Sequence, residues 1–160
     1  MTATNHQQAS QSSPERDVDL SHSLFKVSSE PLSVDSLVAV VLTGGDGAVV
    51  TFVGTVRDNH MGRVVLALEY EAYGGMAESE MEHIGIEMIE RHGLHGIAMQ
   101  HRTGKLAVGE TSVIIAVSSP HRQAAFAACS EALDMLKATV PVWKKEYFED
   151  GEVWVGQGAG

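Results

Sequence analysis

The sequence SSPHR at residues 118–122 opens the segment that decides the fold, and PVWKKE at residues 141–146 closes it. Ser119 is a favourable N-cap residue, and Pro120 suits the first helical position, where its missing N–H loses no hydrogen bond. The proline of the second segment stops a helix, so we expect one from residue 120 to about residue 138. Its apolar positions recur at helical spacing. They are Ala125, Phe126, Cys129, Ala132, Leu133 and Leu136.

Cations gather around this predicted helix, although the chain as a whole is acidic. The sequence has 11 Lys and Arg against 21 Asp and Glu, a formal net charge of −10. From residue 121 to residue 145, however, the cations outnumber the carboxylates. These charged residues are Arg122, Lys137, Lys144 and Lys145, against Glu131 and Asp134. A small cationic patch on an acidic protein predicts a small anionic ligand rather than a nucleic acid, which needs a broad basic face.

The two ends of the predicted helix carry different parts of this patch. His121 and Arg122 lie at the N-terminal end, where the helix dipole disfavours cations, so a bound anion explains them well. Lys137 lies near the other end, where the dipole alone explains a lysine about equally well. About 24 Å separates His121 from Lys137 along a straight helix. Either they serve different sites, or a second copy brings its His121 and Arg122 to this copy's Lys137, which predicts a homodimer with two composite sites.

Length and composition are typical of one globular domain. No apolar run approaches the length of a membrane span and the N-terminus lacks the form of a signal peptide, so we expect a cytoplasmic protein without a membrane partner. The single cysteine, Cys129, lies on the apolar face of the predicted helix, which favours packing over reactivity. Four histidines show no metal-like cluster, so we assign them structural or surface roles and expect no metal. They are His83, His92, His95 and His101.

We expect a disordered tail at residues 1–22, a folded domain at residues 23–156 and a short tail at residues 157–160. Periodicity and turn residues predict the element order β-α-β-β-α-β-β-α-β-β. The strands are expected at residues 25–27, 48–57, 64–73, 97–106, 111–118, 143–148 and 152–155, and the other helices at residues 34–42 and 76–92. This order indicates an α+β fold with helices packed on a largely antiparallel sheet, whose edges invite dimerisation.

Two of these strands carry specific expectations. Gly54 interrupts the strand at residues 48–57 and predicts a bulge or a close approach of backbones. Arg57 stands where that strand meets a polar loop, which is a common position for a site residue, although a solvated strand end explains it about as well. In the strand at residues 64–73, alternate residues are expected to share one face. They are Leu66, Leu68, Tyr70 and Ala72.

Four segments together resemble a known family. FVGTVR at residues 52–57, SSPHR at 118–122, DMLK at 134–137 and PVWKKE at 141–146 are similar, in order and spacing, to the large, catalytic subunit of molybdopterin synthase. Each segment is weak alone, but four in register are specific, and the similarity extends from about residue 25 to residue 155.

The resemblance implies an α/β hammerhead fold, a central homodimer and a sulfurtransferase activity in molybdenum cofactor biosynthesis. Each copy would bind a small ubiquitin-like carrier subunit, giving a heterotetramer. The carrier's C-terminal Gly-Gly thiocarboxylate would supply sulfur to cyclic pyranopterin monophosphate, forming the dithiolene of molybdopterin. No resident cofactor is implied, and no cysteine nucleophile is needed because the sulfur arrives on the partner.

By position, the resemblance also implies the site residues. Lys137 is expected to be the principal catalytic residue, which stabilises charge or moves a proton during sulfur attack, and Lys144 the second. Glu146 would orient Lys144 or accept a proton. The remaining substrate-binding residues would be Thr55, Val56, Arg57, His121, Arg122 and Lys145.

Two other functions use the same cationic patch. The chain could be a non-catalytic dimer that binds a phosphorylated or nucleotide-like effector, or a plain interaction scaffold. Two lysines flanking the proline-valine-tryptophan sequence, with Glu146 beside them, favour an enzyme, because a pure phosphate binder has no need for that carboxylate.

Overall fold

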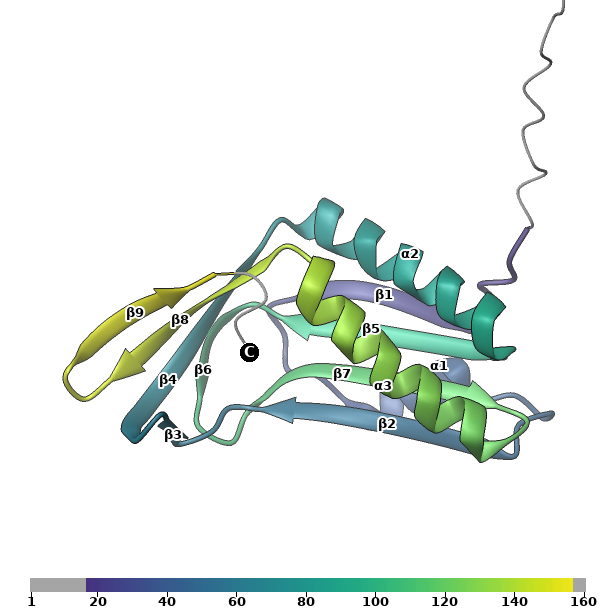
Figure 1. Ribbon diagram of the computed structural model, residues 1–160, viewed down its shortest axis with the longest axis horizontal. Helices are drawn as coiled ribbons and strands as arrows, with labels where there is room; N and C mark the ends of the chain where they lie inside the picture. Colours follow the sequence, from purple (N-terminus) through teal and green to yellow (C-terminus); the bar gives the residue numbers. More distant parts are fainter. Residues whose placement is uncertain (1–16, 157–160) are drawn as a thin grey trace, which may run out of the picture.

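The computed structural model describes residues 17–156, which form three helices and nine strands (Figure 1). The helices are α1 (Val34–Val41), α2 (Gly74–His92) and α3 (Arg122–Thr139). The strands are β1 (Ser23–Ser28), β2 (Ala48–Thr55), β3 (Asn59–His60), β4 (Arg63–Ala72), β5 (Gly96–Arg102), β6 (Gly104–Ala107), β7 (Thr111–Ser119), β8 (Val142–Phe148) and β9 (Gly151–Val155). The α+β class is therefore confirmed.

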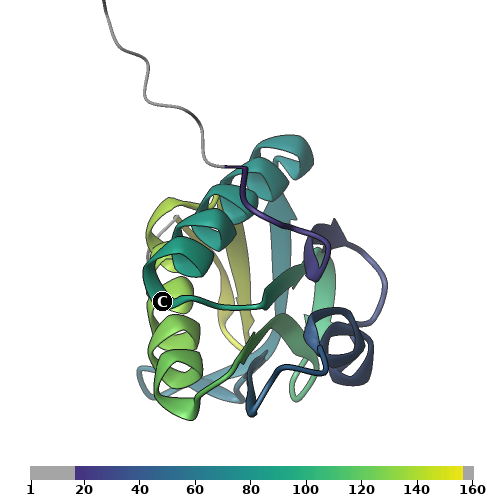
Figure 2. The same cartoon turned by 90° about the vertical axis from the view of Figure 1, so that its right-hand side faces the viewer.

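The strands form two sheets rather than the one that the sequence predicted. The first has the order β1-β5-β7-β2, in which β1 and β5 are parallel and the other pairs antiparallel. Helices α2 and α3 cover one face of this sheet and α1 covers the other (Figure 2). Because both faces are covered, β7 is buried from its second residue onward, and its central residues 113–117 are all apolar. Its Ile115 packs toward α2 and α3, whereas its Ile114 packs toward α1.

The second sheet has the order β3-β4-β8-β9, with β6 also paired to β4. Sequence periodicity predicted a single strand at residues 97–106, but the chain leaves the first sheet after β5 and enters the second as β6. Gly104 lies at this change of sheet with φ of 91°, a conformation that favours glycine. One continuous segment of the chain, residues 96–107, therefore contributes a strand to each sheet.

Two bulges alter the strand faces. The register of β2 against β7 shifts between Gly54 and Thr55, which confirms the prediction made for Gly54. The register of β4 against β8 shifts between Val65 and Ala67. Leu66 is consequently 53% exposed while Val65 and Leu68 are buried. The predicted common face of Leu66 and Leu68 was wrong, because an extra residue at a bulge reverses the alternation.

Helix α3 begins two residues later than predicted. Ser119 is the last residue of β7, where it pairs with Ala48, so it does not cap the helix, and His121 occupies the N-cap position. The predicted packing face is confirmed for the buried Cys129, whose thiol has a pKa raised to about 11 by burial. It is wrong for Phe126, which is 63% exposed.

The two ends of the chain test the predicted tails only in part. Residues 1–16 and 157–160 lie outside the described residues. Residues 17–22 form a loop with a turn, in which the Ser21 N–H donates to Asp19 and the ring of His22 lies 3.3 Å from the carbonyl of Val40. Across residues 17–156, none of the helices has the length and apolar character needed to cross a membrane.

Candidate active site

A cavity of about 590 Å³ lies where the two sheets meet the C-terminal end of α3. Its apolar wall comes from side chains such as Phe52, Leu68 and Leu136. Five of the predicted site residues line it. They are Thr55, Arg57, Lys137, Lys144 and Glu146. Three cations therefore face one carboxylate inside a partly apolar cavity, which suits an anionic ligand that also carries an uncharged ring.

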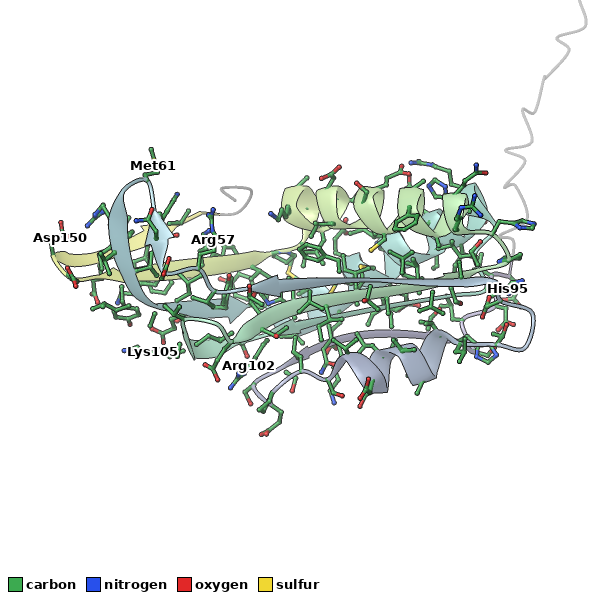
Figure 3. The ribbon with its side chains drawn as sticks, turned by 90° about the horizontal axis from the view of Figure 1, so that it is seen from below. Arg57, Met61, His95, Arg102, Lys105 and Asp150 are labelled. Atoms are coloured by element: carbon green, nitrogen blue, oxygen red, sulfur yellow. The ribbon has the colours of Figure 1, made fainter. Side chains whose placement is uncertain are left out.

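Three elements bring these side chains together. Lys137 lies in the last turn of α3, and β8 begins a few residues later, so the chain returns at once along the cavity wall. Successive side chains on a strand point to opposite faces, which places Lys144 and Glu146 on the cavity side of β8. Arg57 follows β2 and reaches the cavity from the other sheet. Figure 3 shows Arg57 between the loop of Met61 and the helices.

Glu146 is the most deeply placed charge of the site. It is only 4% exposed, so its carboxylate needs partners. The Nδ1 of His60 donates to Oε2 at 2.7 Å, and Nζ of Lys144 lies 3.6 Å from Oε1. Each carboxylate oxygen thus faces a different partner, and Glu146 connects the histidine of one strand to the lysine of another.

Polar residues that stay neutral form another part of the wall. The rings of Tyr70 and His101 meet edge to face, with centroids 4.9 Å apart. The Nδ1–H of His101 donates to the carbonyl of Arg102, and burial lowers the pKa of His101 below its ordinary value. Burial raises the pKa of Tyr70, with the Ser112 hydroxyl opposing this and Glu146 adding to it. These groups can donate or accept hydrogen bonds to a ligand without adding charge near neutral pH.

Two predicted substrate-binding residues do not line the cavity. Lys145 points to the opposite face of β8, where Nζ lies 2.9 Å from Glu152 and close to the rings of Tyr147 and Trp154. Its hydrogen bond to Glu152 raises the pKa of Lys145. Val56 is buried, and its backbone is engaged by the loop between β6 and β7.

His121 and Arg122 also lie away from this cavity, at the opposite end of α3, where both are exposed. Apart from Lys145 and Val56, the predicted site residues thus form two groups within one chain: a cavity group at the C-terminal end of α3 and a pair of exposed residues at its N-terminal end. This agrees with the separation of about 24 Å between His121 and Lys137 that was expected from the length of the helix.

Five polar residues of the cavity were not among the predicted site residues. They are Asn59, His60, Tyr70, His101 and Ser112. The last three had a signal in the sequence, because each is a polar residue inside an apolar strand, although His101 was assigned a structural or surface role. His60 had none, since a histidine in a polar loop is unremarkable.

The fold and the cavity define a class of protein: an α+β protein with a lysine-rich cavity suited to an anionic, ring-bearing ligand. The chain matches the model of the MoaE protein family over residues 27–139. It is 43% identical over 132 residues to the molybdopterin synthase catalytic subunit of Bacillus subtilis strain 168, covering 82% of this chain and 84% of the relative. It is 45% identical over 136 residues to that of Homo sapiens, covering 85% and 72%.

Solved structures agree. The molybdopterin synthase crystal structure from Staphylococcus aureus superposes with a TM-score of 0.80 and 40% identity, covering 83% of this chain and 97% of that one. A complex of subunits 1 and 2 of molybdopterin-converting factor from Helicobacter pylori shares the fold, with a TM-score of 0.67 and 18% identity, over 84% and 90% of the two chains. This chain belongs to the MoaE family of molybdopterin synthase catalytic subunits, enzymes of molybdenum cofactor biosynthesis.

Proposed function

We propose that the cavity is where sulfur passes from the C-terminal thiocarboxylate of a small carrier subunit to cyclic pyranopterin monophosphate. The observation that carries this proposal is the convergence of Lys137, Lys144 and Glu146, with Arg57, on one partly apolar cavity. Both reactants are anionic and one bears a pterin ring. A site with several cations and apolar walls offers what both need.

The two lysines would have distinct roles. Lys137 is more exposed and lies at the rim formed by the end of α3, where it would contact the incoming thiocarboxylate and stabilise charge during sulfur attack. Lys144 is held beside the buried Glu146, where it would act as the second catalytic cation. Once the sulfur is bonded to the pterin, water would cleave the bond between that sulfur and the carrier's C-terminal carbonyl carbon. The carrier would then leave as a carboxylate.

We also propose a composite site in a homodimer of the α/β hammerhead type. His121 and Arg122 are exposed at the end of α3 remote from Lys137, so a ligand in the cavity can meet them only from a second copy. Their charge would hold the phosphate of the pterin. Lys145 and Val56, which are turned away from the cavity, would support β8 and the loop after β2 rather than contact substrate.

The proposed partner is a small sulfur-carrier subunit ending in Gly-Gly, one per copy, giving a heterotetramer. The Helicobacter pylori complex of two molybdopterin-converting factor subunits is a precedent from a chain of the same fold. The single cysteine, which is free and buried, forms no disulfide within the chain and so fits the cytoplasm as the proposed compartment.

The test is an assay of pterin dithiolene formation with purified thiocarboxylated carrier and cyclic pyranopterin monophosphate. We expect multiple turnovers with fresh carrier, and no product when the carrier ends in an ordinary carboxylate. Tight binding of a phosphorylated ligand without any product would instead favour the effector-binding alternative.

A further inference from the structure

His60 lies on a tight hairpin that the proposed function leaves unexplained. Strands β3 and β4 are joined by Met61 and Gly62, with φ of 51° and 79°. Two adjacent positive φ values are typical of the type I′ turn, whose twist matches that of a two-stranded hairpin. The side chain of Asn59 accepts a hydrogen bond from the Gly62 N–H at 3.2 Å, which stabilises the turn. The position of His60 is therefore set by local backbone geometry.

The hairpin is also fixed to the rest of the second sheet. The Val65 N–H donates to the carbonyl of Asp58 at 2.9 Å. The guanidinium of Arg63 lies 3.7 Å from the centre of the Phe148 ring and 2.7 Å from the carboxylate of Asp150. These contacts connect the turn to the β8–β9 hairpin, so the imidazole of His60 is presented to β8 from a rigid support.

The direction of the hydrogen bond between His60 and Glu146 follows from the chemistry of the carboxylate. Its Nδ1 lies 2.7 Å from Oε2 of Glu146, and an ionised carboxylate can only accept, so Nδ1 carries the hydrogen. The other oxygen of Glu146 is 3.6 Å from Nζ of Lys144, beyond the length of a good hydrogen bond. Glu146 is thus held tightly by His60 and loosely by Lys144.

We propose that His60 is a positioning residue of the sulfur-transfer site, an inference that rests on the proposed function. By holding Oε2 of Glu146, it keeps the carboxylate from closing on Lys144. The ammonium of Lys144 then remains available to the reactants. Without His60, the buried carboxylate would have Lys144 as its remaining partner, and a tight ion pair would form between them. That pair would withdraw the ammonium from the chemical step more than from ligand binding.

The chain offers a matched control. His92 on α2 forms the same kind of contact, with Nε2 2.6 Å from a carboxylate oxygen of Glu131 on α3, but it does not line the cavity. Loss of this pair would lower the stability of the α2–α3 packing and leave the chemistry unaffected. A general effect of losing a histidine–carboxylate contact can therefore be separated from an effect on the site.

The experiment compares His60→Leu, His60→Asn and His92→Leu in the dithiolene assay with full-length enzyme and thiocarboxylated carrier. We expect His60→Leu to lower kcat about tenfold with less than a twofold change in the KM for the pterin. His60→Asn keeps an N–H donor at the δ position and should recover most of kcat. His92→Leu should lower the melting temperature and leave kcat unchanged. Unaltered kcat in folded His60→Leu, or equal losses in both His60 variants, would overturn the proposal.

A double-mutant cycle tests whether His60 acts through Glu146. In a Glu146→Gln background, His60→Leu should have little further effect on kcat, whereas independent contributions would multiply. NMR of the unreacted enzyme gives a reading that does not depend on activity: the hydrogen-bonded Nδ1–H of His60 should be visible and should shift upfield in Glu146→Gln. If that signal behaves as expected but wild-type enzyme makes no dithiolene, the proposed function fails while the contact stands. If the signal is absent, the positioning role fails alone.

Discussion

The two ends of α3 differ in how their charged groups are partnered. At the C-terminal end, Lys137 borders a cavity in which Glu146 already has His60 and Lys144 beside it. At the N-terminal end, His121 and Arg122 are exposed and form no ion pair with any residue of the range 17–156. At one end the charges face one another in a cavity, whereas at the other they are exposed to solvent and have no ion-pair partner within residues 17–156.

The backbone at the exposed end is nevertheless well fixed. The Gly47 N–H donates to the carbonyl of Ser119 at 3.1 Å, and a Cβ on Gly47 would lie 2.3 Å from the carbonyl oxygen of Pro120. His95 binds Asp46 in the same region, and Figure 3 shows His95 at the end of the molecule opposite Asp150. Rigid backbone with unpartnered side chains is the arrangement expected of a preformed binding surface, since little order is lost when a ligand arrives.

The largest expected effect comes from removing Lys137, the cation that α3 places at the cavity. Lys137→Ala should lower kcat about a hundredfold to a thousandfold, because a positioned cation that stabilises transition-state charge is worth that much in a partly dry site. Its side chain is exposed and makes no ion pair within the described residues, so melting temperature and oligomeric state should not change. The measurement is single-turnover dithiolene formation with Lys26→Ala, on β1, as the surface-lysine control. Normal turnover would defeat the catalytic assignment.

Much of the cavity end was predictable, because its residues are close in sequence. Lys137, Lys144 and Glu146 lie within ten positions, and the end of a helix followed by a strand brings them to one wall. Strand alternation even separates Lys144 from Lys145, although the resemblance alone grouped them together. Local periodicity is sufficient to predict which residues meet when those residues are close together in the sequence.

Other parts depended on long-range register that no local pattern contains. His60 meets Glu146 across 86 positions, and its location follows from the pairing of β4 with β8 and the bulge at Val65. The same bulge is the reason why the face predicted for Leu66 was wrong. The change of sheet at Gly104 could not be predicted either, because it depends on how β5 and β6 pair with strands far away in the sequence. These features arise from tertiary packing, which overrides local preference.

At the exposed end, Arg122→Ala should raise the KM for the pterin about tenfold and leave kcat nearly unchanged. Loss of a charge-assisted hydrogen bond to phosphate removes binding energy that is equal in the ground and transition states. Arg122→Lys keeps the charge but not the bidentate geometry, and should fall between Ala and wild type. Steady-state kinetics at saturating carrier give both constants. A large fall in kcat with an unchanged KM would mean that Arg122 takes part in the chemistry instead.

Mixing the two variants tests whether the ends meet across subunits. In a mixed dimer of Arg122→Ala and Lys137→Ala, one site has both changes and the other has neither. With random exchange, about half the dimers are mixed and half their sites intact, so about a quarter of wild-type activity should return at low pterin concentration. Verified mixed dimers that show no recovery of activity would rule out the composite arrangement.

The smallest expected effect concerns the support of the exposed end. The carboxylate of Asp46 is buried. It accepts one hydrogen bond from the Thr43 N–H at 2.6 Å and another from the ring of His95 at 2.6 Å. Burial acts to raise the pKa of Asp46, but these hydrogen bonds outweigh it and lower the pKa below its ordinary value. Asp46→Asn keeps one acceptor oxygen and should reduce the free energy of unfolding by about 1 kcal/mol near pH 7. Urea unfolding at several pH values measures this.

The sign of the pH dependence distinguishes this carboxylate from a merely polar contact. A carboxyl whose pKa is lowered by folding contributes its stability fully above its unfolded pKa and loses it as the pH falls through the folded value. The difference between wild type and Asp46→Asn should therefore shrink as the pH falls below about pH 4. Glu30→Gln, on an exposed loop, should show no such convergence. Because Asp46 lies outside the cavity, kcat should be unchanged throughout, and a parallel fall in kcat would mean that the two ends of α3 are mechanically coupled rather than independent.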